Sequence, residues 1–225
     1  MSILNNFDNY IGEHVKMTAS GKVLLSGILV DTGSNIVVLY DGQDFLYIPL
    51  VHVHYLDFNS DDGETINPPD HMPTWIQEDH SISLRKILTN AKGVFTEIFV
   101  TSNQSIHGYV TNVMNDYFTF FSPVHKTMFI PLQHLKWLIP YPYSHRPYSL
   151  SNKDLPLTPS NVPASRTFEE QCKRHLGKVA IFDMGKHPNK IGKLVKVENG
   201  YVEIIIARNK TIFTNLQHVQ TVQFP

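Results

Sequence analysis

Apolar and polar residues alternate along short stretches of this chain, and turn-forming residues separate the stretches. Near the C-terminal end the apolar positions form three such groups: Val179 and Ile181; Ile191, Leu194 and Val197; Tyr201, Ile204 and Ile206. A period near two is typical of half-buried β-strands. Asn199-Gly200 separates the last two groups and favours a two-residue hairpin, because both positions tolerate positive φ. We therefore predict antiparallel strands joined by tight turns.

The chain repeats one pattern three times. Residues 47–53, 129–135 and 213–219 read YIPLVHV, FIPLQHL and FTNLQHV, and their histidines, His52, His134 and His218, are 82 and 84 residues apart. A glycine that opens an apolar run precedes each histidine by 25, 26 and 26 residues: Gly27, Gly108 and Gly192. Two anchors with matched spacing predict three tandem units of roughly 55 to 60 residues.

Each unit contains signals for one short helix and five strands. In the first unit the strands are expected at roughly 14–18, 25–31, 36–41, 44–49 and 51–56, the last two joined almost without a loop. Helical spacing of apolar residues and a following glycine predict helices at 3–10, 84–91 and 168–176. The predicted fold is mainly β, with three tandem five-stranded SH3-like or Sm-like small barrels, each preceded by a short α-helix.

The segments between the units differ from them in composition. Residues 57–80 contain seven acidic residues, no Lys or Arg and three prolines, and residues 139–166 contain six prolines. Such segments are linkers or extended straps. Four aromatic residues suggest that parts of them dock on the barrels: Trp75, Tyr141, Tyr143 and Tyr148. We predict barrels at 1–56, 81–138 and 167–225, an acidic linker at 57–80 and a proline-rich linker at 139–166.

Composition narrows the class of protein. Hydrophobic residues are 42% of the chain and support packed cores, whereas charged residues are 17%, against about 25% in soluble domains. The net charge of -1 provides no chain-wide attraction to nucleic acid. The sequence has neither a long apolar run nor a signal-peptide pattern, which predicts cytoplasmic synthesis and no membrane partner. The single cysteine, Cys172, fits a reducing compartment, and we expect it to pack on a helix face.

The chain lacks the motifs of known catalytic classes. It contains no nucleophile elbow, P-loop, dinucleotide-binding fingerprint or zinc-hydrolase motif. His52-Val53-His54 lies near Asp61, Asp62 and Glu64, but no metal-binding spacing supports a divalent-ion site there. We predict a protein that is not an enzyme, with no catalytic residue, metal or cofactor.

Two groups of side chains are candidates for structural or binding roles. His52, His134 and His218 are expected to hold a tight corner by capping backbone groups. The second group, Lys186, Lys190, Lys193 and Lys196, forms a candidate partner-binding basic patch. Residues 167–225 have a charge balance of +4 and residues 1–80 a balance of -10, which suggests head-to-tail self-association or an acidic partner. The same charge distribution is also compatible with ordinary solvated surfaces that bind no partner.

The glycine-led second strand and the Leu-x-His-hydrophobic corner resemble the two signatures of the Sm/LSm fold. The arrangement of three such repeats is similar to the amino-terminal region of the spore coat protein B family. The strands that begin at His134 and His218 resemble the strands that end that family's repeats. That family's Gly-Gly-Pro-Glu turn and its Ser/Lys/Arg-rich tail have no counterpart in this sequence. Because the tail has no counterpart, this chain cannot perform the role of that tail in the same way. The resemblance would nevertheless cover nearly the whole chain.

The resemblance implies a function as well as a fold. It implies a structural and interaction protein of the spore coat, which assembles through barrel edges with other coat proteins and with itself. The alternative is an RNA-binding Sm-like module, in which a histidine near the corner can lie at the rim that faces the ligand.

Overall fold

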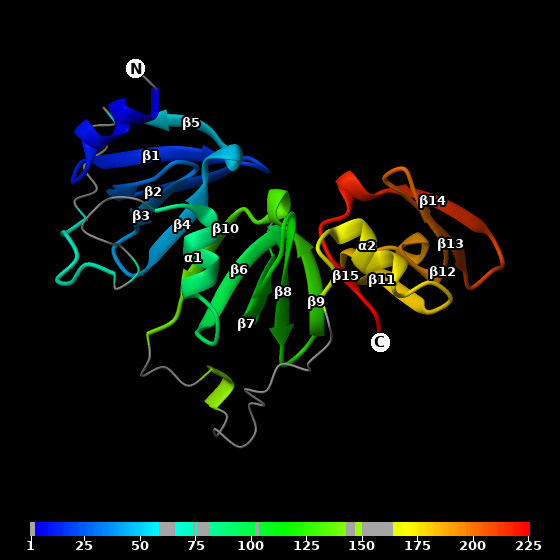
Figure 1. The fold of residues 1–225 in the computed structure, drawn as a ribbon. Helices are drawn as coiled ribbons and strands as arrows, with labels where there is room; N and C mark the ends of the chain where they lie inside the picture. The colour runs from blue at the N-terminus through cyan, green and yellow to red at the C-terminus, as the bar shows by residue number, and fades with distance from the viewer. Residues whose placement is uncertain are drawn as a thin grey trace. The chain divides into compact units, whose positions relative to one another are not determined.

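The computed structural model describes residues 3–58, 66–73, 75, 82–101, 104–142, 147–149 and 164–225 (Figure 1). The chain divides into two compact units. The first unit comprises residues 1–91, 96–105 and 135–142, and the second comprises residues 92–95, 106–134 and 143–225. The two units interleave in sequence, so segments from the middle of the chain belong to both.

The strands of the first unit follow the order β6-β10-β4-β3-β2-β1-β5. Their bounds are β1 His14–Ala19, β2 Val23–Thr32, β3 Ile36–Tyr40, β4 Phe45–Pro49, β5 Val53–Asp57, β6 Phe95–Thr101 and β10 Trp137–Pro140. Neighbours in this order pair antiparallel. A 3-10 helix at Ile3–Tyr10 precedes β1, and a single 3-10 turn at Leu50–His52 joins β4 to β5.

The strands of the second unit follow the order β14-β13-β12-β11-β15-β9-β8-β7. Their bounds are β7 Gln104–Val113, β8 Tyr117–Ser122, β9 Lys126–Pro131, β11 Val179–Phe182, β12 Ile191–Glu198, β13 Tyr201–Ile206, β14 Thr211–Asn215 and β15 Val222–Gln223. Three-residue 3-10 turns occur at Leu132–His134, Pro147–Ser149, Asp183–Gly185, Pro188–Lys190 and Leu216–His218.

Two short α-helices begin at capped residues. Helix α1, Leu84–Asn90, starts after Ser83, whose Oγ accepts a hydrogen bond from the Lys86 amide at 3.3 Å. Helix α2, Phe168–Lys173, starts after Thr167, whose Oγ1 accepts one from the Glu170 amide at 3.3 Å. These hydroxyls satisfy amides that have no partner inside the helix. Helix α2 is shorter than the range 168–176 that the apolar spacing predicts.

The prediction of a mainly β fold is confirmed. In the first repeat, β1, β3 and β4 lie within a residue of their predicted bounds, whereas β5 begins at Val53 rather than at residue 51. The reason for this difference is the 3-10 turn Leu50–His52, which makes the corner with three residues of its own. The segment 81–138 contributes strands to both units: β6 and β10 belong to the first, and β8 and β9 to the second.

A glycine in the second strand of each repeat allows two backbones to approach closely. A Cβ added at Gly27 would lie 2.3 Å from the carbonyl oxygen of Tyr40. At Gly108 it would lie 2.0 Å from that of Phe121, and at Gly192 it would lie 2.7 Å from that of Ile205. Atoms cannot come so close without displacing the backbone, so glycine recurs at this position for a steric reason.

The same strands share a second irregularity just after the glycine. Their pairing with the third strand shifts between Leu29 and Asp31 in β2, between Val110 and Asn112 in β7, and between Leu194 and Lys196 in β12. In all three the shift starts two residues after the glycine. A bulge bends a strand and increases its twist. The three repeats therefore have one backbone pattern in common at this point, as their sequences do.

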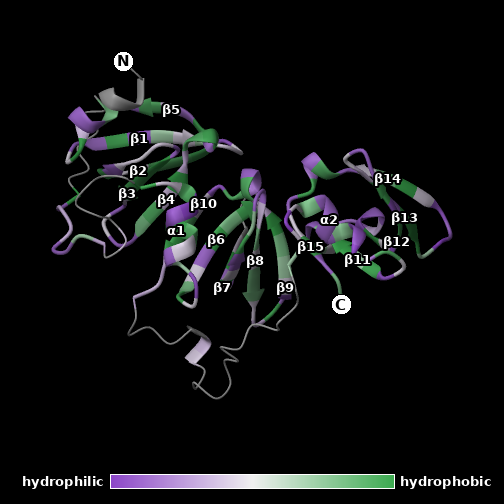
Figure 2. Cartoon of the chain, in the orientation of Figure 1, coloured by the Kyte–Doolittle hydropathy of each residue, from purple (hydrophilic) through white to green (hydrophobic). Residues whose placement is uncertain are grey.

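Each unit has its own hydrophobic core. Figure 2 shows that hydrophobic positions lie mainly along the strands and hydrophilic ones mainly in the turns. One core of the first unit consists of Val15, Met17, Ala19, Leu29, Val37, Leu39, Leu46, Ile48 and Trp137. One core of the second unit is made of Tyr117, Phe129, Phe168, Cys172, Ala180, Phe182, Leu194, Val197, Val202, Ile204, Leu216, Val219 and Val222. Both combine residues from two successive repeats.

Candidate functional site

The repeats are joined to one another by strand pairing, and the same pairing occurs twice. In the first unit β10 pairs antiparallel with β4, where Leu138 lies opposite Tyr47. In the second unit β15 pairs antiparallel with β9, where Val222 lies opposite Phe129. In each case the fifth strand of one repeat pairs with the fourth strand of the repeat before it. We call these the first junction (β4 with β10) and the second junction (β9 with β15).

The first junction is closed by a tryptophan from the later repeat. Trp137 is buried in the core that β1 to β4 form, although it belongs to the second repeat. Its ring stacks on Phe99, with ring centroids 4.4 Å apart and an interplanar angle of 24°. Tyr47 and Leu138, the paired residues, are fully buried. The fifth strand of the second repeat thus completes the core of the first.

The second junction is built around Tyr117 and Phe129. Their ring centroids are 6.1 Å apart, and the Tyr117 ring lies 5.9 Å from that of Phe168 in the third repeat. The Tyr117 hydroxyl donates to the Ser165 carbonyl at 2.8 Å and is 3.1 Å from Oε1 of Gln171. Burial is the largest cause that raises the pKa of Tyr117, so the hydroxyl stays protonated and remains a donor.

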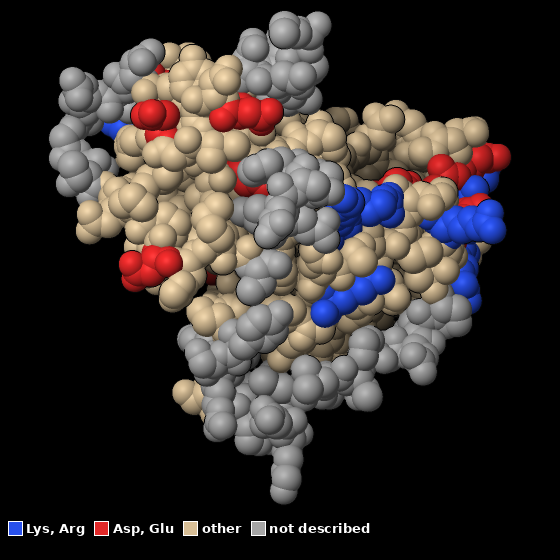
Figure 3. Space-filling view, turned by 60° about the vertical axis from the view of Figure 1, so that its left-hand side comes forward, with Lys and Arg blue, Asp and Glu red and all other residues tan. Residues whose placement is uncertain are grey.

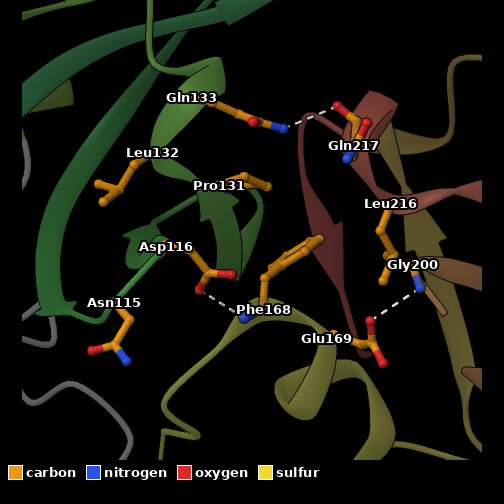
Figure 4. Close-up of a pocket in the computed structure, with 10 residues that line it drawn as sticks. All are labelled: Asn115, Asp116, Pro131, Leu132, Gln133, Phe168, Glu169, Gly200, Leu216 and Gln217. Carbon is orange, nitrogen blue, oxygen red and sulfur yellow. Dashed lines mark hydrogen bonds between the residues drawn. The ribbon is translucent and has the colours of Figure 1, made fainter. Parts of the chain in front are cut away.

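A pocket of about 500 Å³ opens beside the second junction (Figure 4). Its lining is drawn from the second and third repeats: Asn115, Asp116, Pro131, Leu132, Gln133, Phe168, Glu169, Gly200, Leu216 and Gln217. Its two carboxylates already accept backbone hydrogen bonds. Oδ1 of Asp116 accepts from the Phe168 amide at 2.9 Å, and Oε2 of Glu169 accepts from the Gly200 amide at 3.1 Å. Both carboxylates therefore act as structural acceptors: Asp116 links the second repeat to the third, and Glu169 holds α2 to the turn before β13 within the third repeat.

The corner histidine of the first repeat is bonded inside its own repeat. His52 is buried, and its Nδ1 is hydrogen-bonded to Oγ of Ser20 at 3.0 Å. The Ser20 amide donates to the His52 carbonyl at 2.9 Å. Oγ of Ser20 also bonds Nε2 of His54 at 3.1 Å. This serine links the corner to the end of β1.

The other two corner histidines differ from His52 and from each other. Nε2 of His134 donates to the carbonyl of Gln217 at 2.8 Å, and Nε2 of Gln133 donates to the same carbonyl at 3.1 Å. His134 therefore caps a backbone group of the next repeat, across the second junction. Burial is the largest cause that lowers its pKa. His218 is exposed.

The four lysines of the candidate basic patch are not equivalent. Nζ of Lys190 forms an ion pair with Oδ2 of Asp183 at 2.8 Å, and Nζ of Lys196 forms one with Oε2 of Glu198 at 2.5 Å. Lys186 and Lys193 are exposed. In Figure 3 the charged side chains lie in small separate groups on a surface that is mostly uncharged. Two of the four cations are thus partly neutralised within the third repeat.

Of the four linker aromatic residues, Trp75 packs on the first unit. Trp75 is buried, and its ring centroid lies 5.5 Å from that of Tyr47 at the first junction. Tyr148 remains exposed, with its ring 6.3 Å from Phe95. Tyr143 lies outside the described residues.

No group of three or more potential metal ligands occurs among the residues that the structure describes. Asp61, Asp62 and Glu64, which the sequence placed near His52 and His54, lie outside that part of the chain. Within the described ranges no helix has the length and apolar character needed to span a membrane.

The residues that form the junctions were not among the predicted site residues. The available signal was the aromatic residue that opens the repeated motif, present as Tyr47, Phe129 and Phe213. An aromatic residue on a fourth strand is equally compatible with a local core position. Only the pairing of that strand with a later repeat shows that it forms an interface.

The strands and the two junctions define a mainly β protein whose repeats join edge to edge. A sequence profile described as YwrJ third domain matches residues 167–222, a range within the third predicted unit. The uncharacterized protein YwrJ of Bacillus subtilis (strain 168) is similar to this chain, with 41% identity over 227 residues that cover 99% of this chain and 100% of that protein. The chain belongs to the YwrJ family.

Proposed function

We propose that this protein is a structural and interaction component of the bacterial spore coat. It is built of three Sm-like barrels, has no catalytic activity, and assembles with coat proteins through strand edges. The observation that carries this proposal is the repeated junction, in which a fifth strand adds to the fourth strand of another repeat. Strand addition of this kind binds through main-chain hydrogen bonds, while the side chains at the pairing provide selectivity.

The proposal of three barrels is supported by features that recur at equivalent positions. The first repeat has the strand order β5-β1-β2-β3-β4, and the third has the corresponding order β15-β11-β12-β13-β14. The close-contact glycine and the bulge two residues later occur in all three repeats. Each repeat also turns from its fourth strand into a Leu-x-His 3-10 turn.

The surface is suited to contacts with other proteins. Charged residues are 17% of the chain, so neighbouring molecules repel each other less than highly charged proteins do. Several large apolar side chains on strands are exposed: Leu24, Tyr55, Val179, Val195, Tyr201 and Phe213. The acceptors beside the pocket are occupied by backbone amides, which favours a structural role over a catalytic one.

The place of action rests on the resemblance to the spore coat protein B family. The test is to follow the protein with an antibody through growth and sporulation, and then to extract purified spores in steps. We expect synthesis during sporulation and recovery in the insoluble coat fraction. A protein that is made in vegetative cells and never enters purified spores would refute the proposal.

RNA binding is the competing function, and the exposed Lys186 and Lys193 are the observation that favours it. A phosphate-binding surface loses affinity as salt rises, because bound cations are released from the nucleic acid. We expect the purified protein to show no salt-dependent retention of single-stranded RNA on filters. Retention that disappears in Lys186→Glu and Lys193→Glu would support RNA binding instead. Lys22→Glu in the first repeat is the matched charge control, because Lys22 is also exposed.

A further inference from the structure

Two strand edges lie at the ends of the repeat series. Among the described strands, β14 pairs only with β13 and β5 pairs only with β1, so each ends the strand order of its own unit. β14 is the fourth strand of the third repeat, and β5 is the fifth strand of the first. These are the two types of strand that pair with each other at both junctions.

The β14 edge exposes residues that the junctions bury. Phe213 is 68% exposed, whereas the residues at its position in the other repeats, Tyr47 and Phe129, are 0% and 3% exposed. The same contrast holds on the neighbouring strand: Tyr201 is 51% exposed, and its equivalent Tyr117 at the second junction is 0% exposed. The third repeat therefore presents the aromatic surface of a junction, and none of the described strands covers it.

The β5 edge shows the complementary contrast. Tyr55 is 62% exposed, whereas the residues at its position in the fifth strands of the later repeats, Trp137 and Thr221, are 5% and 0% exposed. Leu56 is half-buried, and its equivalents at the two junctions are fully buried: Leu138 and Val222. The first repeat thus presents a fifth strand that pairs with no fourth strand within the part of the chain that the structure describes.

We infer that β14 of one copy pairs with β5 of a second copy and forms a third junction, in which Leu56 lies opposite Phe213. This register follows from the two junctions within the chain, where Leu138 lies opposite Tyr47 and Val222 opposite Phe129. The inference rests on the proposed function, because it extends edge pairing from repeats of one chain to separate molecules. The partner is a second copy of this protein.

Charge favours the same pairing. In an antiparallel register that sets Leu56 against Phe213, Asp57 comes opposite Ile212, near the N-terminal end of β14. The exposed cations Arg208 and Lys210 immediately precede that end. The wider segments also have opposite signs, with a balance of -10 over residues 1–80 and +4 over residues 167–225. Opposite charges on the two partners speed their association and oppose wrong pairings of like ends.

A corner hydrogen bond provides a further match. At the second junction the side chains of Gln133 and His134 donate to the carbonyl of Gln217. Their equivalents in the third repeat, Gln217 and His218, are exposed. In the third junction these donors reach the carbonyl of Val51 in the second copy, because Val51 occupies the position of Gln217 in its own repeat. The exposed His218 thereby acquires the role that His134 has inside the chain.

The interface is heterologous, because each copy contributes a different edge to it. Such head-to-tail contacts produce closed rings or open chains, since every bound copy still offers one edge. The association should therefore depend on protein concentration and should not stop at a two-fold symmetric dimer in which identical edges meet.

The first experiment measures the mass of the full chain in solution by sedimentation velocity over a range of concentrations. We expect the mass to rise above that of one chain. Phe213→Arg, and independently Tyr55→Arg, should weaken self-association about 10- to 100-fold, because each removes a buried aromatic contact. Leu24→Arg is the control, because Leu24 is exposed on β2, which has strand neighbours on both sides. A constant one-chain mass at all concentrations would overturn the inference.

The second experiment tests which edges meet. The native thiol, Cys172, is buried and does not interfere. We expect an oxidised mixture of Leu56→Cys and Phe213→Cys proteins to form a disulfide-linked two-chain product, which neither protein forms alone. Cross-linking of one variant to itself would overturn the head-to-tail arrangement, as would a one-chain internal disulfide in the double variant.

These outcomes are separate from those that test the proposed function. A protein that is found in the spore coat but stays a single chain in solution refutes the third junction and leaves the coat function in place. A protein that assembles head to tail but never enters spores refutes the coat function and leaves the junction in place.

Discussion

Replacing Trp137 with alanine tests whether the first junction is part of the core of the first unit. The side chain is 5% exposed and packs among residues of β1 to β4. A buried tryptophan removes roughly 200 Å² from water, which at about 25 cal/mol per Å² corresponds to about 5 kcal/mol. Measured losses for aromatic-to-alanine changes in cores are about 3–5 kcal/mol. We expect Trp137→Ala to lower the free energy of unfolding of the first unit by this amount.

The assay is denaturant unfolding followed by circular dichroism, with the protein dilute enough to be a single chain. The matched control is Tyr55→Ala, because Tyr55 occupies the same position of the repeat but is exposed. Surface substitutions change stability by about 0.5 kcal/mol or less, so this variant should unfold like the wild type. If Trp137→Ala lowered the free energy of unfolding by less than about 1 kcal/mol, or by no more than Tyr55→Ala does, the conclusion that Trp137 stabilises the core of the first repeat would be refuted.

Three further predictions follow from individual contacts. Gly108→Ala should destabilise the second unit by about 1–3 kcal/mol in thermal melts, because the new Cβ would lie 2.0 Å from the Phe121 carbonyl oxygen. Cys172 should not react with a thiol reagent at about pH 8 until the chain unfolds, because burial raises its pKa to about 12. Burial lowers the pKa of His134 below 6.5, so the unfolded chain binds more protons on acidification. Stability should fall from about pH 7.5 to about pH 5.5, and fall less in His134→Gln.

Each of these predictions has a result that contradicts it. A Gly108→Ala protein with the wild-type melting temperature would show that the close approach of β7 and β8 is not required. Rapid labelling of Cys172 in the native protein would contradict its burial. For His134, the control is His218→Gln, whose imidazole is exposed. If the two histidine variants changed the pH dependence equally, His134 would not be the cause of the loss of stability at low pH.

Local signals in the sequence were enough to predict the strands and the repeat. The alternation of apolar residues located β1, β3 and β4 within a residue, because burial on one side of a strand imposes a period of two on the sequence. The recurring glycine marked a position where a backbone of the neighbouring strand leaves no room for a side chain. Both signals depend on contacts between strands that are close in sequence, and such contacts leave a pattern within a few tens of residues.

The partners of the edge strands were decided by the tertiary structure. A fifth strand with buried apolar residues is compatible with the core of its own repeat and with that of the repeat before it, because both present the same alternation. Trp137 therefore gives no sign in the sequence that it completes the first repeat. Likewise the three corner histidines share one motif but differ in their contacts. His52 bonds a serine of its own repeat, His134 caps a carbonyl of the next repeat, and His218 is exposed. The role of each depends on its place in the series of repeats, and a repeated motif is the same at every place.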